Sequence, residues 1–492
     1  MRKVKILTIL CSIIWLFSSF TLNITSYADF QSLYEIYNEA ELYSDGVYMV
    51  NLDTGTVIIS KNADKKQYPL STTKIMTCLV ALENVKDFSE IVSVPYDCFN
   101  EFFQGNPNYS NVSNAEIAPL QDNLTYWDCL YALMLPSACE AANVIAYNVA
   151  GSLEGFTAMM NETAQKIGCT NTHFDNAHGL FTENNYTTAY DMYLITKYAL
   201  DNYEEGFMRI CTTTEYQMPA NKYHTSGYTI TSTNQLMSQS TPYYTEGVQG
   251  IKTGTISRYY YKKDGKWDES NYERGTRALV STAQRNGYRY LVVTLGAPYY
   301  NDDGTIPDVI RTFQDHKNLY NWAFNEFEYT QIIVKNQEVM QAKVEKGEDA
   351  DNVGLVTTEA FSTLLPKSTG ESAVQRVLPT IETLTAPVTA GTTVGELELR
   401  LNGETISKIP LVTNNSINLD PVVYYREKIS DFFHNPLVIA GIAIIIVLIV
   451  GLTAAAIVNK NHRKKQAELQ RRRKINMAPK SASRNSRNNR YK

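Results

Sequence analysis

The segment from Leu437 to Val458 limits most strongly what this chain can fold into, because none of its 22 residues is charged. At a rise of 1.5 Å per residue, a helix of that length is about 33 Å long and crosses the hydrocarbon core of a bilayer. A buried core helix is the alternative. The residues that follow, 459–492, carry 13 Lys and Arg against the single acid Glu468. Basic flanks stay on the cytoplasmic side, so the sequence predicts a single-pass protein with residues 437–458 in the membrane and a basic cytoplasmic tail, 459–492.

The N-terminus has the pattern of a secretory signal peptide. Basic residues stand at positions 2, 3 and 5, an apolar run covers 6–20, and Ser26-Tyr27-Ala28 places small residues at the −3 and −1 positions of a cleavage site. An uncleaved membrane anchor is the alternative, but the apolar run is short for a bilayer span. We therefore expect residues 1–28 to be removed and 29–436 to lie outside the cell.

Charge and cysteine usage narrow the class of protein. The whole chain carries −6, and without the tail (+12) and the signal segment (+3) the rest carries −21. Such an acidic ectodomain argues against a nucleic-acid partner. Six cysteines remain after the signal segment, far apart and without a CxxC pair, so we expect buried thiols and no metal site, with one disulfide left open.

Local patterns predict a mixed α/β region over residues 29–329. Short apolar runs around Asp53-Thr54-Gly55 and around Asn286-Gly287 predict two pairs of strands. Helical spacing follows Ser71, recurs over 127–150, and returns after the strands that end near Gly296. The predicted strands are 47–50, 57–59, 278–280 and 290–295, and the last predicted helix buries Leu319, Trp322, Ala323 and Phe327.

Composition changes near Thr330. From there to about residue 420 the chain alternates as strands do, is rich in Val, Thr and Leu, and has turn signals at Ala390-Gly391, Asn402-Gly403 and Pro410. We expect a small all-β domain over 330–420, folded as a sandwich. Residues 421–436 then form a linker to the membrane span.

Ser71 and Lys74 form the first candidate catalytic pair. Positions i and i+3 share one face of a helix. A serine hydroxyl is a weak nucleophile until a neighbouring base takes its proton, and a lysine serves as that base when its pKa is lowered by burial or by a second cation. The motif Ser-x-x-Lys alone is weak evidence, because composition produces it by chance.

Lys252-Thr253-Gly254-Thr255 is the second candidate element. In a strand Lys252 and Gly254 point to the same side, and the absent side chain of Gly254 would let a substrate backbone approach the strand. The ammonium group and the threonine hydroxyls suit a terminal carboxylate. The alternative is an ordinary edge strand that ends in a glycine turn.

Ser137, in Pro136-Ser137-Ala138-Cys139, is the third candidate. Its hydroxyl would pass a proton between Lys74 and a leaving amine, whereas the plainer alternative is an N-cap serine without a chemical role. His173 and His178 lie near neither a set of acidic ligands nor a Gly-x-Ser-x-Gly elbow, so we expect them to be structural.

The order of these three elements is the pattern of penicillin-reactive enzymes. The chain resembles, more narrowly, the low-molecular-mass D-Ala-D-Ala carboxypeptidases over nearly the whole ectodomain. The further segments that carry this resemblance are Asp53-Thr54-Gly55, 68–77, 172–180, 186–192, 250–254, 385–395 and 409–412.

The resemblance implies a DD-peptidase/β-lactamase fold, an antiparallel sheet flanked by helices, and a function. Ser71 would be acylated by a peptidoglycan stem peptide ending in D-Ala-D-Ala, Lys74 would be the base, and Ser137 the proton relay. Lys252 would set the electrostatic field, Thr253 and Thr255 would help to hold the carboxylate, and β-lactams would inhibit. No metal or organic cofactor is implied.

Cys139 departs from the family pattern, which usually has asparagine there. An amide binds substrate backbone and orients Lys74 better than a thiol does, so the departure concerns turnover rate and β-lactam affinity. It also keeps a catalytically silent, penicillin-sensing protein open as an alternative. A β-lactamase is a further alternative, although Glu154 and Glu162 lack a Glu-x-x-Leu-Asn context. Endopeptidase and transpeptidase activity stay open.

Overall fold

The computed structural model describes residues 41–109, 112–401 and 403–476. The predicted signal peptide, 1–28, and the end of the predicted tail lie outside these residues. The chain divides into two compact units that interleave in sequence. One runs to Lys335 and takes up 359–378 and 397–409, and the other holds the remainder. The domain boundaries expected at 329 and 420 stay a prediction.

A five-stranded antiparallel sheet organises the first unit, in the order β2-β1-β9-β8-β5. The strands predicted around both turns are confirmed. Asn286 and Gly287 join β8 to β9 with φ of 53° and 87°, the left-handed conformation that a two-residue hairpin turn requires. The strands are β1 Gly46–Asn51, β2 Val57–Lys61, β5 Lys252–Thr255, β8 Thr276–Arg285 and β9 Tyr288–Pro298.

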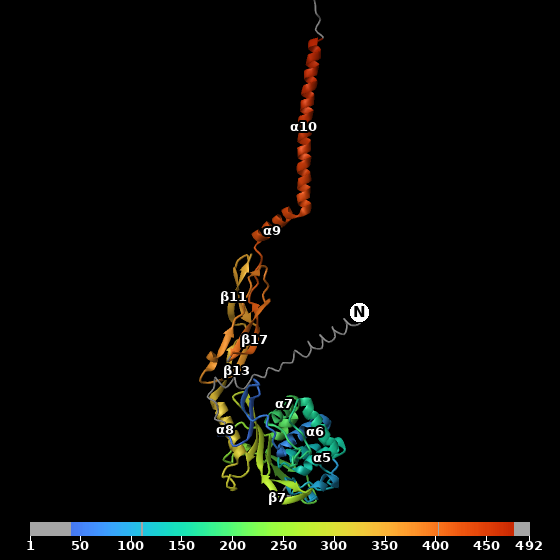
Figure 1. The fold of residues 1–492 in the computed structure, drawn as a ribbon, viewed down its shortest axis with the longest axis vertical. Coiled ribbons are helices and arrows are strands. Elements are labelled where there is room, and N and C mark those ends of the chain that lie inside the picture. Colours follow the sequence, from blue (N-terminus) through green and yellow to red (C-terminus); the bar gives the residue numbers. More distant parts are fainter. Residues whose placement is uncertain (1–40, 110–111, 402, 477–492) are drawn as a thin grey trace, which may run out of the picture. The chain divides into compact units, whose positions relative to one another are not determined.

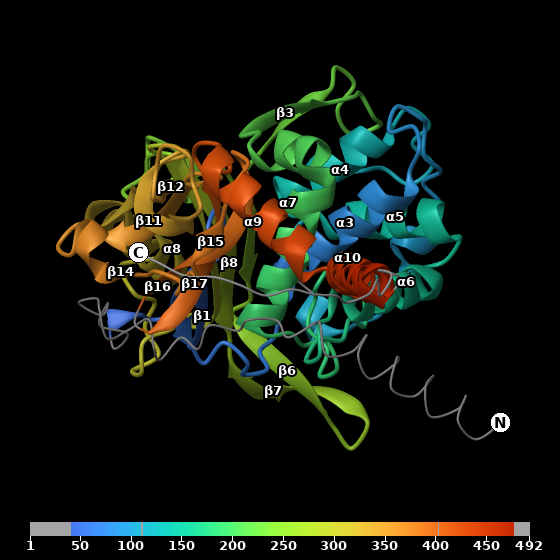
Figure 2. The same ribbon diagram turned by 90° about the horizontal axis from the view of Figure 1, so that it is seen from above.

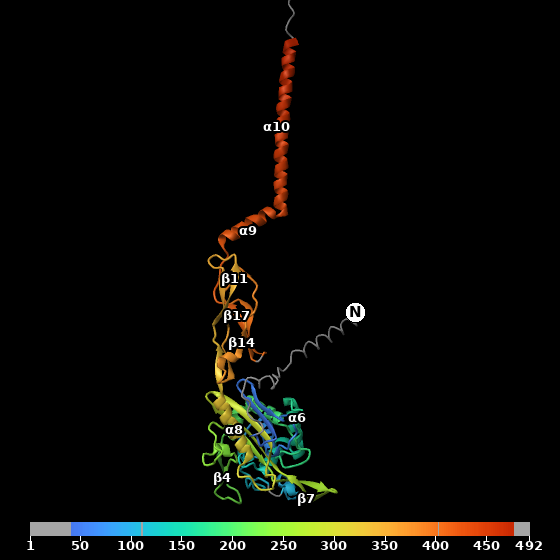
Figure 3. The same ribbon diagram turned by 60° about the vertical axis from the view of Figure 1, so that its left-hand side comes forward.

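Helices lie on both faces of this sheet, with α8 on one side and the layer that contains α5, α6 and α7 on the other (Figures 1 and 3). Alternate residues of β9 face the two layers, as the period of a strand demands: Tyr290 and Val292 pack with α8, whereas Leu291 and Val293 pack with the helical layer. The helices are α3 Lys74–Asn84, α4 Tyr126–Met134, α5 Cys139–Ala150, α6 Leu153–Ile167, α7 Ala189–Cys211 and α8 Arg311–Glu326.

The structure differs from the predicted helices in two details. The apolar run over 127–150 is divided into α4 and α5 by the residues around Ser137, whose φ is 71°. The helix around Trp322 ends at Glu326, so Phe327 begins strand β10 and is not helical. Its ring still packs edge-on against Trp322, which explains why it fitted the apolar stripe.

Short elements complete the first unit. The β6–β7 hairpin extends away from the sheet (Figure 2), and β3 and β4 form a separate hairpin. These elements are β3 Glu215–Met218, β4 Tyr228–Thr231, β6 Arg258–Lys263 and β7 Lys266–Arg274, with the 3₁₀ turns η3 Leu70–Thr73, η4 Tyr96–Cys98, η5 Asn100–Phe103, η6 Pro107–Tyr109 and η7 Gln235–Met237.

The region after Glu326 is all-β as predicted, and its sandwich packing stays a prediction. Pro410 lies inside β17 and not in a turn. Proline has no N–H to donate, but the carbonyl of Pro410 accepts a hydrogen bond from the N–H of Thr358. The elements are β10 Phe327–Ile333, β11 Glu338–Glu345, β12 Asn352–Thr357, β13 Phe361–Pro366, η8 Gly370–Ala373, β14 Val374–Val377, β15 Leu384–Thr385, β16 Thr393–Leu401 and β17 Glu404–Thr413.

Two helices follow. The segment expected as a linker is largely helix α9, Pro421–His434, with Asp420 as its N-cap. Helix α10, Pro436–Asn476, includes the predicted span and continues into the basic residues. Within the described chain, α10 is the one helix long and apolar enough to cross a membrane.

Candidate active site

The predicted nucleophile and base lie together at the start of the first helix. Ser71 is half-buried in the turn η3, and Lys74 is the first residue of α3. The Nζ atom of Lys74 lies 3.2 Å from the Oγ atom of Ser71. The helix therefore begins close to Ser71, as predicted, and the i,i+3 spacing places the two groups within hydrogen-bond reach.

Lys74 is completely buried, and its amine has three neighbours. Besides Ser71 it contacts the Sγ atom of Cys139 at 3.6 Å and donates a hydrogen bond to the main-chain carbonyl of His178. Burial lowers the pKa of Lys74, while the neighbouring Cys139 and Glu140 work in the opposite direction. The amine is thus closer to the neutral, basic form than an exposed lysine.

Ser137 and Cys139 occupy the break between α4 and α5. The N-cap of α5 is Ala138, so the reading of Ser137 as an N-cap is wrong. The hydroxyl of Ser137 is buried and has no hydrogen-bond partner among the described residues. A left-handed backbone conformation and an unpaired buried hydroxyl both cost folding free energy. Such features are typical of functional sites, where a bound group can satisfy the hydroxyl.

Strand β5 holds the third element at the edge of the sheet. Lys252 and Gly254 are both buried, which agrees with their predicted place on one side of the strand, and Thr255 is exposed. Burial lowers the pKa of Lys252, and the charge of Lys74 lowers it further. Two residues further on, a Cβ atom at Gly254 would lie 3.2 Å from the backbone nitrogen of Ser71, and the amine of Lys74 contacts Cys139. These contacts bring the three sequence motifs together.

The role of Gly254 differs from the predicted one. A Cβ atom at this position would lie 3.1 Å from the Cβ of Leu70 and 3.2 Å from the backbone nitrogen of Ser71. The space is therefore filled by the segment that carries the nucleophile and not left for a substrate. A side chain at this position would require β5 or η3 to shift by a few tenths of an ångström.

Three groups that contact the predicted site residues were not themselves predicted from the sequence. The hydroxyl of Thr233 lies 2.6 Å from that of Thr253, and Arg277 donates to the hydroxyl of Thr255 at 3.3 Å. Arg277 is the partner of Thr255 in the β5–β8 register, so only the pairing of strands reveals it. The third is the main-chain carbonyl of His178, whose contact with Lys74 agrees with the expected structural role near the site.

Two further observations concern Arg258 and the cysteines. Arg258, an exposed residue of β6, stacks on the ring of Tyr272 with 4.6 Å between its guanidinium carbon and the ring centroid. The cysteines are buried thiols, as predicted, at positions 78, 98, 129, 139, 169 and 211.

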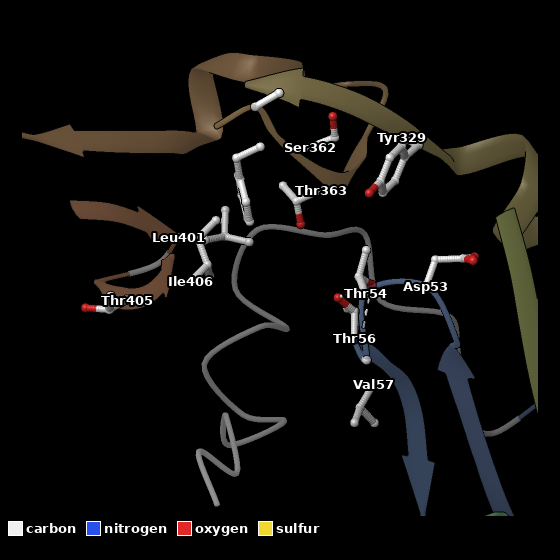
Figure 4. Close-up of a pocket in the computed structure, with 13 residues that line it drawn as sticks. Asp53, Thr54, Thr56, Val57, Tyr329, Ser362, Thr363, Leu401, Thr405 and Ile406 are labelled. Atoms are coloured by element: carbon white, nitrogen blue, oxygen red, sulfur yellow. Dashed lines mark hydrogen bonds between the residues drawn. The ribbon is translucent and has the colours of Figure 1, made fainter. Parts of the chain in front are cut away.

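A separate hollow in the first unit, of about 480 Å³, contains none of the predicted site residues. Its wall includes the turn after β1 and residues of β10, β13, β16 and β17, and both hydroxyl-bearing and apolar side chains line it (Figure 4). The hydroxyls belong to Thr54, Thr56, Tyr329, Ser362, Thr363 and Thr405, and among the described residues no lysine or histidine lines the hollow. The candidate catalytic residues thus lie outside this hollow.

Comparison with known proteins agrees with this geometry. Residues 35–299 match the family model described as D-alanyl-D-alanine carboxypeptidase, and residues 327–418 match that of the C-terminal domain of penicillin-binding protein 5. The D-alanyl-D-alanine carboxypeptidase DacF of Bacillus subtilis is 26% identical over 77% of this chain and 87% of its own length. DacC of Escherichia coli is 29% identical over 75% of this chain and 83% of its own length.

Solved structures share the fold. Penicillin-binding protein 6B from Escherichia coli superposes with a TM-score of 0.54 at 21% identity, covering 77% of this chain and 98% of that one. Penicillin-binding protein 5 from Haemophilus influenzae gives a TM-score of 0.52 at 21% identity, with the same coverage. Since the first family model alone covers more than half of the sequence, the chain belongs to the D-alanyl-D-alanine carboxypeptidase family.

Proposed function

We propose that the protein is a serine D-Ala-D-Ala carboxypeptidase that removes the terminal D-alanine of peptidoglycan stem pentapeptides through an acyl-enzyme at Ser71. The observation that carries the proposal is the 3.2 Å contact between Ser71 Oγ and a buried Lys74 Nζ, in a chain of this family. Family membership does not favour a β-lactamase or a silent binding protein.

Acylation begins with proton transfer from Ser71 to the neutral amine of Lys74. The Oγ atom then attacks the carbonyl carbon between the two D-alanines and forms a tetrahedral oxyanion. The backbone N–H groups of Ser71 and Thr255 are its proposed donors, and each such donor contributes about 3–4 kcal/mol to lowering the barrier.

Collapse of the intermediate breaks the C–N bond and leaves the peptide as an ester on Ser71. The departing D-alanine takes up the proton from Lys74, with the hydroxyl of Ser137 as the relay. Its lack of a partner among the described residues leaves this hydroxyl available for that bond. Water then hydrolyses the ester, releases the tetrapeptide and restores the serine. Every group in this scheme comes from the chain, so the scheme uses no metal or cofactor.

The substrate would lie along β5, the edge strand of the sheet. An edge strand offers unpaired backbone groups to an extended peptide. The carboxylate of the terminal D-alanine would be held by Thr253 and Thr255, within the positive field of Lys252 and Arg277. A penicillin carries a carboxylate and an acylating carbonyl in a similar arrangement, and would therefore leave Ser71 acylated.

The protein would act outside the cell, held to the membrane by α10. The uncharged stretch of that helix and the 13 basic residues after it support a single pass with the tail inside. The signal peptide proposed for 1–28 would deliver the catalytic part to the cell wall, where its substrate lies.

Intact-mass measurement after incubation with benzylpenicillin tests the proposal. Wild type should gain one penicilloyl group, located on the peptide containing Ser71, and should release D-alanine from a D-Ala-D-Ala pentapeptide. Ser71→Ala should do neither. Folded wild-type protein that gains no adduct and releases no D-alanine would refute the mechanism, whereas labelling without release would indicate a penicillin-sensing protein.

A further inference from the structure

Glu101, in the turn η5, joins two elements that surround the catalytic lysine. Its Oε1 atom accepts hydrogen bonds from Asn143 Nδ2 at 2.5 Å and from His178 Nε2 at 3.1 Å. Asn143 lies on α5 one turn after Cys139, and it also donates to the carbonyl of Cys98. A single carboxylate oxygen therefore ties the loop of His178 to the helix of Cys139.

The imidazole of His178 has one possible arrangement of its proton. The backbone N–H of Leu180 donates to Nδ1 at 3.1 Å, so Nδ1 is an acceptor and the proton resides on Nε2, facing Glu101. The ring is fully buried, with the rings of Phe102 and Tyr109 at centroid distances of 5.6 and 5.7 Å. Without Glu101, a buried N–H would lose its partner.

The main-chain carbonyl of His178 fixes the rotation of the Lys74 amine. A carbonyl oxygen only accepts, so one N–H of the amine must point at it. A neutral amine has two N–H groups and one lone pair. With one N–H on His178 and the other toward the sulfur of Cys139, the lone pair is left for the hydroxyl of Ser71.

Close packing makes this carbonyl sensitive to the position of its loop. Thr77, one turn after Lys74, donates to the carbonyl of Ala177 at 2.5 Å. Gly179 has a φ of +79°, and a Cβ there would lie 1.9 Å from the carbonyl oxygen of Leu70. The backbone on both sides of His178 is thus held against η3 and α3. Its ring packs against Phe102 and Tyr109, and its two nitrogen atoms are held by the N–H of Leu180 and by Glu101.

We propose that Glu101 is a positioning residue for the reaction: through the ring of His178 it holds the His178 carbonyl in the place that aims the lone pair of Lys74 at Ser71. The inference rests on the proposed function, in which Lys74 is the base. Glu101 acts indirectly, because its carboxylate contacts His178 and Asn143 and not the reacting atoms.

The electrostatic state of the pair agrees with a fixed geometry. Burial works to raise the pKa of Glu101, but the hydrogen bonds from His178 and Asn143 outweigh it and hold that pKa below its usual value. Burial lowers the pKa of His178. At neutral pH the pair is therefore a carboxylate accepting from a neutral imidazole.

The test is the rate constant of acylation by fluorescent penicillin, measured at saturation in stopped flow on the full chain in detergent. Glu101→Ala should lower this rate constant by between about 10- and 100-fold, the cost of a small misplacement of a reacting group, with the dissociation constant of the non-covalent complex unchanged. Glu101→Gln keeps an acceptor oxygen for both donors, so its rate constant should stay within about threefold of wild type.

Glu83 supplies a matched control in the same helical layer. It accepts from Lys166 and Tyr198, so Glu83→Ala removes a comparable carboxylate at the far end of α3. Its acylation rate constant should equal that of wild type even where its melting temperature falls. Asn143→Ala should have an intermediate effect, and the double variant with Glu101→Ala should be no slower than Glu101→Ala alone.

Two results would overturn the proposal. One is an acylation rate constant of Glu101→Ala equal to that of wild type, and the other is equal slowing of Glu101→Ala and Glu83→Ala in proportion to lost stability. Failure of the proposed function has a separate signature, because wild type itself would then not be acylated, or Ser71→Ala would be acylated as fast.

Discussion

The Sγ atom of Cys139 lies 3.6 Å from the Nζ atom of Lys74, at the first residue of α5. The family pattern usually has asparagine at this position. A thiol accepts only weakly from the amine, and it cannot offer the two N–H donors of an amide to a substrate. Cys139 is 1% exposed, so its contact with Lys74 is shielded from bulk solvent.

Replacing Cys139 by asparagine should increase the rate of acylation. The amide oxygen would accept from Lys74, and the amide nitrogen would donate to the substrate backbone. One gained hydrogen bond of about 1.4 kcal/mol corresponds to about a tenfold change. We expect Cys139→Asn to raise the second-order rate constant for fluorescent penicillin by about that factor, with Cys139→Ala at or below wild type. Equal rates for the two variants would contradict this role of the position.

The pH dependence of acylation should reflect the buried lysine. Burial lowers the pKa of Lys74 from its ordinary 10.5. A base acts in its neutral form, so the rate should rise with pH through the lowered pKa and reach its plateau below pH 10.5. Lys74→Arg stays charged at every accessible pH and should show no acylation. A wild-type rate that still climbs as an exposed lysine titrates would exclude Lys74 as the base.

Stability should depend on the same ionisation. Between the lowered pKa of the folded state and 10.5, the unfolded chain binds the extra proton, so this contribution to stability grows as pH rises and is lost as pH falls through the folded pKa. Urea unfolding of wild type and of Lys74→Met across this window should show a steeper rise for wild type. Parallel curves would contradict the shift.

Adding a single methyl group at Gly254 should inactivate the protein. The new Cβ would meet Leu70 and the nitrogen of Ser71 at 3.1–3.2 Å, and would push the nucleophile away from β5. We expect Gly254→Ala to lose at least about 100-fold in acylation. Gly46→Ala, in β1 of the same sheet, meets nothing closer than 3.6 Å and should behave as wild type. Normal acylation in Gly254→Ala would show that the close approach is dispensable.

Arg277 should contribute to binding of the substrate carboxylate. It donates to Thr255, so its guanidinium lies beside the proposed carboxylate site. Arg277→Ala should raise KM for a D-Ala-D-Ala peptide by about tenfold, as expected for loss of one charge-assisted hydrogen bond, with kcat within about twofold. Arg258→Ala removes a charge that stacks on Tyr272 instead, and its KM should not change. Equal KM values for the two variants would place the carboxylate elsewhere.

The sequence alone determined the parts of this protein that follow from short-range geometry. Ser71 and Lys74 meet because three residues span most of a helical turn, and Lys252 and Gly254 face inward together because a strand alternates. Local sequence also predicted the turn at Asn286-Gly287 and the apolar stretch of α10, because each depends on neighbouring residues alone. The family followed from the order of these motifs.

Only the tertiary structure decided what surrounds them. The acceptor that orients Lys74 is a main-chain carbonyl 104 residues away, and every residue has such a carbonyl, so no side-chain pattern marks it. Arg277 reaches Thr255 through the register of β8, and Gly254 leaves little room for a side chain because η3 packs against β5. Glu101 gains its partners in the same way. Packing brings such distant groups together, and packing depends on the whole chain rather than on any one segment.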